Sequence, residues 1–284
     1  MIQLHDVVKR YGARNAVDHA TFDVPEGTSL ALWGSNGAGK TTLIRCILGV
    51  TGYEGDVRVD GISSRRKGKQ ARARIGYVPQ SMPTFDVSVA EMVQLVARLR
   101  RADPRPGLEQ LEAFGLGHTL KQPVASLSGG MKQKMALTLA LLGDPPILLL
   151  DEPTANLDAR SQSELIATLV DLKHQGRTIV FTSHRWSEVR ALADRVVRLE
   201  SGKTVGYGTV QEMEPKLDTV TLRLPLPTES LDTAVEHLAQ HGFTAGRNGH
   251  AVLVTVDGAR KAEPLMLLAQ KDYSISDFIV EEEA

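Results

Sequence analysis

A glycine-rich stretch near the N-terminus has the residue types and spacing of a phosphate-binding loop, because it reads Gly-x-x-x-x-Gly-Lys-Thr. An apolar run typical of a buried strand precedes it at 29–33, and helical spacing follows at 41–48. We expect backbone N–H groups to cradle an anion, the Lys40 ammonium to reach the terminal phosphates of a nucleotide, and the Thr41 hydroxyl to ligate Mg²⁺. The candidate nucleotide-binding residues here are Gly34, Ser35, Asn36, Gly37, Ala38, Gly39, Lys40, Thr41 and Thr42.

Two adjacent carboxylates close a second apolar run, at 147–150. Asp151, at the predicted strand end, suits a Mg²⁺-linked role, and Glu152 suits a general base that polarises an attacking water. His184 follows another predicted strand and has polar neighbours, so it could sense phosphate or orient water. Strand, carboxylates and histidine together indicate nucleotide hydrolysis.

Three further positions could complete such a site, although each also has a plain structural interpretation. Gln80 ends a predicted strand and would point towards the ligand crevice of an open α/β sheet. Tyr11 could stack on an adenine, or it could be an ordinary packed or exposed ring. Ser128 can cap a helix whose first residues, Gly129 and Gly130, free backbone N–H groups for an anion, or this is simply a capped helix.

The composition limits what kind of protein can carry these groups. Of 284 residues, 42% are hydrophobic, so the chain can bury a core, and the net charge of −1 gives no indication of a nucleic-acid or acidic partner. The single cysteine, Cys46, lies in an apolar run and fits a reducing cytoplasm and a packing role. The N-terminus does not look like a signal peptide and no apolar run approaches 18 residues, so we expect any membrane role to need a partner.

Periodicity places the remaining elements around the phosphate-binding loop. Alternation at 2–8 and 16–24 predicts a small antiparallel sheet, and helical spacing predicts a helical insertion at about 85–135. The basic run 65–74 is either a solvated surface or a contact for anionic lipid headgroups or a partner loop. From residue 216 the pattern changes and predicts a β-α-β-α-β domain with an acidic end. Its expected elements are strands at 219–224, 251–256 and 275–280 and helices at 229–241 and 262–269.

Residues 1 to about 213 resemble, motif by motif and in order, the ATP-binding subunit of ABC transporters. The resemblance implies an α/β fold for residues 1–213: a P-loop NTPase core with an antiparallel β subdomain and a helical insertion. The change of pattern at residue 216 adds a small α+β C-terminal domain (216–284). The chain departs from many members only in having Met131 where they carry Gln. The matching motifs are the adenine-stacking Tyr11, the Walker A loop at 34–42, the Q-loop Gln80, the signature at 127–131, the Walker B pair Asp151 and Glu152, the D-loop at 155–158 and the switch His184.

The resemblance also implies how the chain works. Its cofactors would be ATP and Mg²⁺, with Thr41, Gln80 and Asp151 at the metal and Glu152, His184 and Gln80 in catalysis. Two cassettes would pack head to tail, as a homodimer or with a paired ABC subunit, so that ATP lies between Walker A of one and the signature residues Ser128, Gly129 and Gly130 of the other. A single cassette without a fused membrane span is similar to the ATPases of exporters whose transmembrane permease is a separate subunit. We therefore expect a peripheral protein at the cytoplasmic face of the cell membrane.

The alternative is a soluble ABC-type ATPase that acts on nucleic acid or on the ribosome. The DNA-repair type carries long coiled coils between its halves, and the roughly 47 residues between Gln80 and Ser128 leave no room for them. The translation-factor type has two cassettes in one chain, and this chain has one. A purely structural nucleotide sensor would lack the base, yet Glu152 is present. We therefore expect no nucleic-acid partner, and the cargo and its direction stay open.

Overall fold

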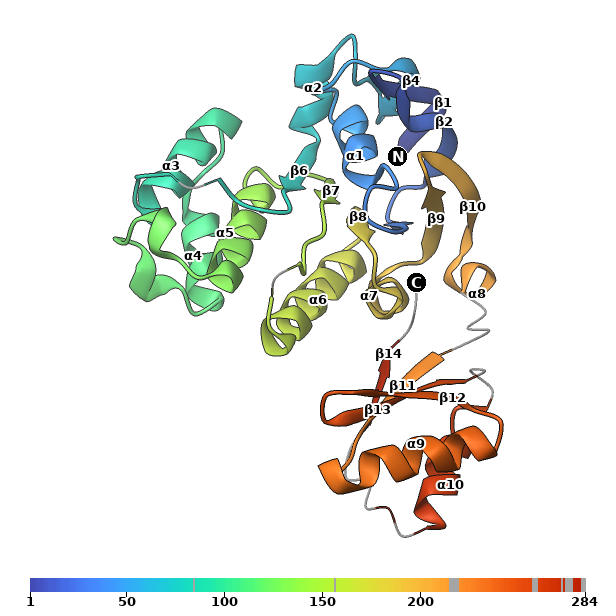
Figure 1. Cartoon of the computed structure of the whole chain (residues 1–284). Coiled ribbons are helices and arrows are strands. Elements are labelled where there is room, and N and C mark those ends of the chain that lie inside the picture. The colour runs from blue at the N-terminus through green and yellow to red at the C-terminus, as the bar shows by residue number, and fades with distance from the viewer. Residues whose placement is uncertain are drawn as a thin grey trace. The chain divides into compact units, whose positions relative to one another are not determined.

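The computed structural model describes residues 1–83, 85–155, 157–214, 220–256, 260–271, 273 and 278–281. The chain divides into two compact units, Met1–Met213 and Glu214–Ala284 (Figure 1). Within the described residues no helix has both the length and the apolar character needed to cross a membrane.

One mixed sheet forms the centre of the first unit. In the described part of the chain its strand order is β5-β4-β1-β2-β10-β9-β3-β8-β7-β6. The segment β9-β3-β8-β7-β6 is parallel, whereas β1, β2, β4 and β5 pair antiparallel. The strands are β1 (Ile2–Tyr11), β2 (Arg14–Val24), β3 (Ser29–Trp33), β4 (Glu54–Val59), β5 (Ile62–Ser63), β6 (Ile75–Val78), β7 (Ile147–Leu150), β8 (Thr178–Ser183), β9 (Arg195–Glu200) and β10 (Lys203–Thr209).

Burial explains this arrangement. Every side chain of β3, β7 and β8 is buried, as expected of parallel strands covered on both faces. Leu43 and Ile44, near the start of the helix that follows the phosphate-binding loop, share an apolar core with β1, β2 and β4. A second core lies on the other side of the parallel strands and includes Phe181 and Trp186. The ends of β3, β6, β7 and β8 are thereby fixed beside one another.

The helices follow the expected order. Figure 1 shows α3, α4 and α5 gathered beside the parallel strands, around a core that includes Val93, Leu111 and Met135. Ser88 and Glu91 form a capping box at the start of α3. The helices are α1 (Lys40–Ile47), α2 (Gly68–Ala73), α3 (Val89–Arg100), α4 (Arg105–Ala113), α5 (Gly129–Leu141), α6 (Ala159–His174), α7 (Trp186–Leu192) and α8 (Val210–Met213), with 3₁₀ turns at Gly117–Thr119 and Val124–Ser126.

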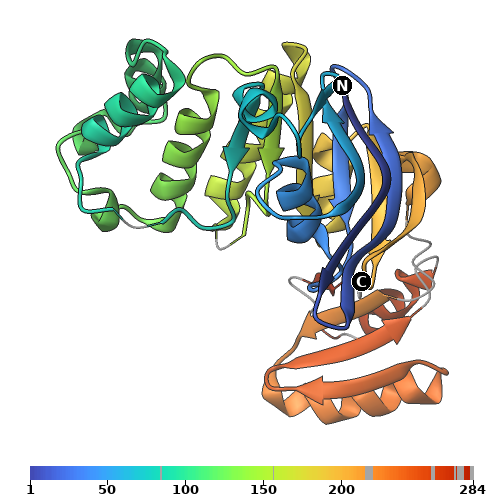
Figure 2. The same ribbon diagram turned by 90° about the horizontal axis from the view of Figure 1, so that it is seen from above.

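The second unit is an antiparallel sheet covered by two helices. In its described residues the strand order is β12-β13-β11-β14, and Figures 1 and 2 show both helices on one face of the sheet. Leu222, Leu231, Val252 and Leu268 belong to its core. Its elements are β11 (Val220–Pro225), a 3₁₀ turn (Thr228–Ser230), α9 (Leu231–Gln240), β12 (Thr244–Asn248), β13 (Ala251–Val256), α10 (Glu263–Ala269) and β14 (Ile279–Glu281).

The prediction for this unit was wrong in one element. The order is β-α-β-β-α-β, because β12 pairs with β13 as a hairpin that the sequence did not reveal. Its sequence, Thr-Ala-Gly-Arg-Asn, lacks apolar alternation, since at this sheet edge most of its side chains are exposed. Much of the last predicted strand and the acidic residues after Glu281 lie outside the described residues.

Candidate nucleotide-binding and hydrolysis site

The phosphate-binding loop joins β3 to α1 and passes so close to its neighbours that only glycine fits at two positions. A Cβ atom on Gly34 would lie 2.3 Å from the Leu199 carbonyl oxygen, and one on Gly39 would lie 2.2 Å from that of Ala16. Gly39 also has a φ of +105°, which favours glycine. The residues between them, Ser35 to Gly37, are exposed, while Ala38 is buried. The two glycines therefore let the loop pass close to β9 and β2 on its way from β3 to α1.

Lys40 lies under this loop and is only 5% exposed. Its Nζ donates hydrogen bonds to the carbonyl oxygens of Gly34 (2.7 Å) and Ser35 (3.1 Å). The same atom is 3.3 Å from Glu152 Oε1, which provides the countercharge. The ammonium is thus held among oxygens at the position where the sequence predicted the terminal phosphates.

Asp151 directly follows β7 and faces the first turn of α1. Its Oδ1 accepts hydrogen bonds from the hydroxyls of Thr41 (3.0 Å) and Thr182 (2.9 Å). Burial raises the pKa of the Asp151 carboxyl, and these two hydroxyls partly offset that rise. A hydroxyl and a carboxylate oxygen are the hard donors that Mg²⁺ prefers, so Thr41 and Asp151 fit the expected metal.

Glu152 is the point on which the other candidate residues converge. Its φ of +44° is rare for a residue with a side chain, and its backbone N–H donates to Thr182 Oγ1 at 2.7 Å. Its Oε2 accepts from Gln80 Nε2 at 3.4 Å and lies 3.6 Å from His184 Nδ1. That nitrogen is buried and has no hydrogen-bond partner among the described residues. The carboxylate thus lies within reach of Lys40, Gln80 and His184 together.

A cavity of about 400 Å³ opens over the loop, within the size range of small-molecule sites. The Tyr11 ring lies at its lining and is 49% exposed, which leaves a face for stacking on a base. Most of the predicted loop residues line the cavity, whereas Asp151 and His184 lie beside it. The lining residues are Tyr11, Arg14, Ala16, Asn36, Gly37, Gly39, Lys40, Thr41, Thr42, Gln80 and Glu152.

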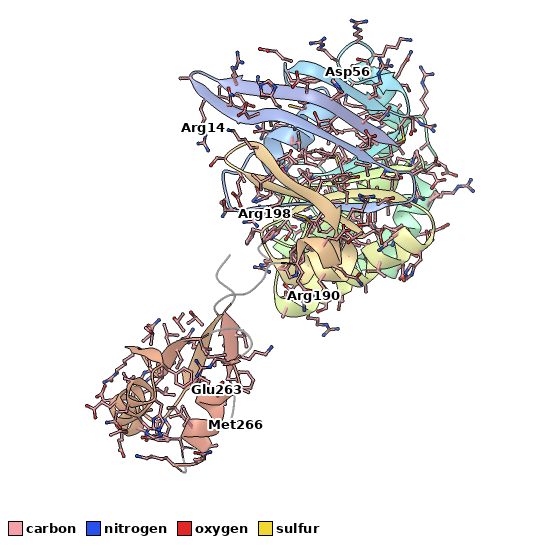
Figure 3. The ribbon with its side chains drawn as sticks, turned by 90° about the vertical axis from the view of Figure 1, so that its right-hand side faces the viewer. Arg14, Asp56, Arg190, Arg198, Glu263 and Met266 are labelled. Carbon is pink, nitrogen blue, oxygen red and sulfur yellow. The ribbon has the colours of Figure 1, made fainter. Side chains whose placement is uncertain are left out.

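Arg14 and Thr182 are site residues that the sequence analysis missed. Arg14 begins β2, and its Nη2 donates to the Gly37 carbonyl oxygen at 3.1 Å (Figure 3). It adds a second cation to the cavity wall beside Lys40. Thr182 holds both Asp151 and Glu152 from the neighbouring strand. Neither belongs to a motif, although the position of Thr182 near the end of a predicted strand beside His184 was a usable signal.

The second predicted anion site does not meet the first within this chain. Ser128 caps α5, and its hydroxyl accepts from the Met131 N–H at 3.4 Å. Ser128, Gly129 and Gly130 are not in the lining of the cavity over Lys40. In the predicted D-loop, Asp158 caps α6 through the Ser161 N–H, while Asn156 lies outside the described residues.

Known proteins share this architecture and sequence. The ABC transporter family profile matches residues 17–155. The linearmycin resistance ATP-binding protein LnrL of Bacillus subtilis is 30% identical over 228 residues, which cover 78% of this chain and 73% of that protein. The Nod factor export ATP-binding protein I of Paraburkholderia xenovorans is 35% identical over 213 residues, covering 73% and 70%. Against the much longer rat ATP-binding cassette sub-family A member 7, the match is 35% and spans 11% of that protein.

The structure comparison agrees. A dimeric post-hydrolysis state of the ATP-binding cassette MJ0796, bound to ADP and Pi, matches with a TM-score of 0.68 and 26% identity, over 74% of this chain and 99% of that one. These matches confirm the α/β P-loop fold predicted from the sequence. They also confirm the prediction that the protein is an ATPase. Because LnrL and the Nod factor export ATP-binding protein I are matched over most of their length, the chain belongs to the ABC transporter family, as an ATP-binding cassette.

Proposed function

We propose that this chain binds and hydrolyses ATP to power a transporter whose membrane-spanning part is a separate subunit, and that it exports. The observation that carries the hydrolytic role is the convergence of Lys40, Gln80 and His184 on the Glu152 carboxylate. The names of the relatives, Nod factor export and linearmycin resistance, favour export.

Each group at the site has a role in this proposal. Lys40 and the loop N–H groups hold the phosphates, and the exposed Tyr11 ring stacks on the adenine. Thr41 and Asp151, with Gln80, would hold Mg²⁺, and the bound ion would supply positive charge against the phosphates. Glu152 accepts a proton from the attacking water, and His184 beside it orients the water or the leaving phosphate.

Replacing Glu152 by glutamine tests the role of the base. The amide keeps the size and hydrogen bonding of the side chain and loses the proton acceptor, so ATP affinity should stay near wild type while kcat falls about 10²–10⁴-fold. Turnover and nucleotide affinity would be measured on the same preparation. The exposed Glu109 on α4 offers a matched control, because Glu109→Gln makes the same chemical change away from the site. Near-normal turnover of Glu152→Gln would contradict the assignment.

A dimer completes the site in this proposal. Ser128, Gly129 and Gly130 offer helix-start N–H groups but do not line the cavity of their own chain. A second cassette would supply them, as a homodimer or as a paired ABC subunit. Mixing two inactive variants, Lys40→Ala and Ser128→Arg, tests this, because a mixed dimer restores one site with an intact loop and an intact signature. Mixed dimers that neither hydrolyse ATP nor bind one ATP tightly would rule out the shared site.

A surface between α1, α2 and α3 supports docking to a membrane subunit. A cavity of about 310 Å³ there is lined by Arg45, Arg72 and Arg100 with apolar side chains, and by no carboxylate among the described residues. Three large apolar side chains nearby in sequence, Val50, Leu95 and Leu99, are exposed, Leu99 by 76%. A loop that carries a carboxylate and apolar groups would complement this surface.

Purification of the native complex from membranes, with mass spectrometry of the partner, tests this part of the proposal. We expect a multi-span membrane protein to co-purify with the wild-type chain and to be lost from Arg45→Glu. The cassette would then be peripheral at the cytoplasmic face of the cell membrane. Recovery of nucleic acid or ribosomes in place of a membrane protein would instead favour a soluble ABC-type ATPase.

A further inference from the structure

A buried carboxylate lies outside the nucleotide cavity, on the first turn of α7. Glu188 is only 5% exposed. Its Oε1 accepts hydrogen bonds from Thr154 Oγ1 (2.6 Å) and Gln162 Nε2 (2.8 Å), and its Oε2 accepts from Ser183 Oγ (2.7 Å). Arg185 Nη1 lies 3.5 Å from Oε1 and supplies a nearby positive charge. Both oxygens of Glu188 are therefore engaged.

The partners of Glu188 belong to the segments that carry the candidate catalytic residues. Thr154 follows Glu152 by two residues, and Ser183 immediately precedes His184. Gln162 is in α6, the helix that Asp158 caps. One carboxylate thus ties together the loop after β7, the end of β8 and the start of α6.

Two additional hydrogen bonds close this network around His184. Ser183 Oγ accepts from the Arg185 N–H at 3.0 Å, so one hydroxyl links the residues on both sides of the histidine. Arg185 Nη1 also donates to Gln162 Oε1 at 3.2 Å. His184 Nδ1 makes no hydrogen bond with a described residue. Hydrogen bonds of the residues on both sides of His184 therefore hold the segment that carries this ring.

Packing alone does not explain a carboxylate at this position, because burying its charge costs desolvation free energy. Trp186, Val189 and Leu192 on the same helix enter an apolar core, where an aliphatic side chain would pack without desolvating a charge. A buried charge is tolerable when hydrogen bonds satisfy it, and here they fix three segments in one register. The chemistry of Glu188 thus suits placement of loops.

We propose that Glu188 is a positioning residue for ATP hydrolysis, which holds the His184 segment, and through it the His184 ring, at the distance from Glu152 that turnover requires. The inference rests on the roles proposed above for Glu152 and His184. It assigns Glu188 no contact with the nucleotide, so its loss should change kcat and leave nucleotide binding intact.

The test uses the full chain and four variants: Glu188→Ala, His184→Ala, the double variant, and Glu109→Ala as an exposed control. For Glu188→Ala we expect a kcat about a hundredfold lower, with KM for ATP within about threefold of wild type. Because Glu188 acts through His184, the double variant should be no slower than His184→Ala alone. Glu109→Ala should match wild type. Thermal melting of each variant shows whether the fold is retained.

A second variant decides the matter if Glu188→Ala does not fold. Ser183→Ala removes only the hydroxyl that joins Glu188 to the backbone beside His184. We expect it to lower kcat as much as Glu188→Ala does. In a His184→Ala background the same substitution should lower kcat no further. Wild-type kcat in the folded variant, or a full further loss on top of His184→Ala, would overturn the inference. Wild-type turnover of His184→Ala would instead overturn the role proposed for the histidine, so the two failures are distinct.

Discussion

Replacing Thr182 by valine should disable the site and destabilise the cassette without changing the size of a buried side chain. Thr182 is 0% exposed, and its hydroxyl donates to Asp151 Oδ1 at 2.9 Å while accepting the Glu152 N–H at 2.7 Å. A hydrogen bond to a charged group contributes about 1.5–3 kcal/mol, and an unpaired buried N–H costs about 1–3 kcal/mol. We therefore expect the free energy of unfolding to fall by about 3–5 kcal/mol.

The same change also bears on turnover. Glu152 has a φ of +44°, which its surroundings must enforce, and the hydrogen bond to Thr182 is one such constraint. Without it the Glu152 carboxylate loses its fixed position, and a misplaced catalytic group typically lowers kcat about a hundredfold.

A matched control lies on the same strand. Thr178 is also buried in β8, and among the described residues its hydroxyl accepts one hydrogen bond, from the Gly27 N–H at 2.9 Å. Thr178→Val should cost about 1–2 kcal/mol and leave kcat unchanged. Urea unfolding followed by tryptophan fluorescence reports this unit specifically, because both tryptophans of the chain, Trp33 and Trp186, lie in it. Equal losses of stability in the two variants, together with wild-type turnover of Thr182→Val, would refute the reasoning.

Three other expectations follow from single groups. Lys40→Ala should weaken ATP binding at least about tenfold in calorimetry, because it deletes the charge that meets the phosphates; equal affinity would contradict this. Burial raises the folded-state pKa of Asp151 above its unfolded value, so its ionisation at neutral pH opposes folding. Asp151→Asn should therefore raise the free energy of unfolding at pH 7. This gain in stability should vanish as the pH falls below about 3.9, the pKa of an aspartate in the unfolded chain. A gain in stability that grows as the pH falls would contradict the prediction. Burial also raises the pKa of the Cys46 thiol to about 12, so iodoacetamide should label it in urea and not in the folded protein.

The parts of the candidate site whose residues lie close together in sequence could be predicted from the sequence. The phosphate-binding loop spans nine consecutive residues, 34–42, and strand ends are marked where an apolar run meets a polar residue, as at Asp151 and His184. Thr182, Arg14 and Glu188 were not found, because each acts through a partner distant in sequence. The β12 strand was missed for a related reason: its pairing with β13, not its composition, makes it a strand.

The strand order also has a consequence for synthesis of the chain. β2 and β3 are consecutive in sequence, yet β10 and β9 lie between them in the sheet. The ribosome must add about 160 residues after Trp33 before β9 can pair with β3, which takes about 8–32 s at 5–20 residues per second. During that time both strands present unpaired edges, so nascent chains that end before Arg195 should be better substrates for chaperones and proteases than the finished protein.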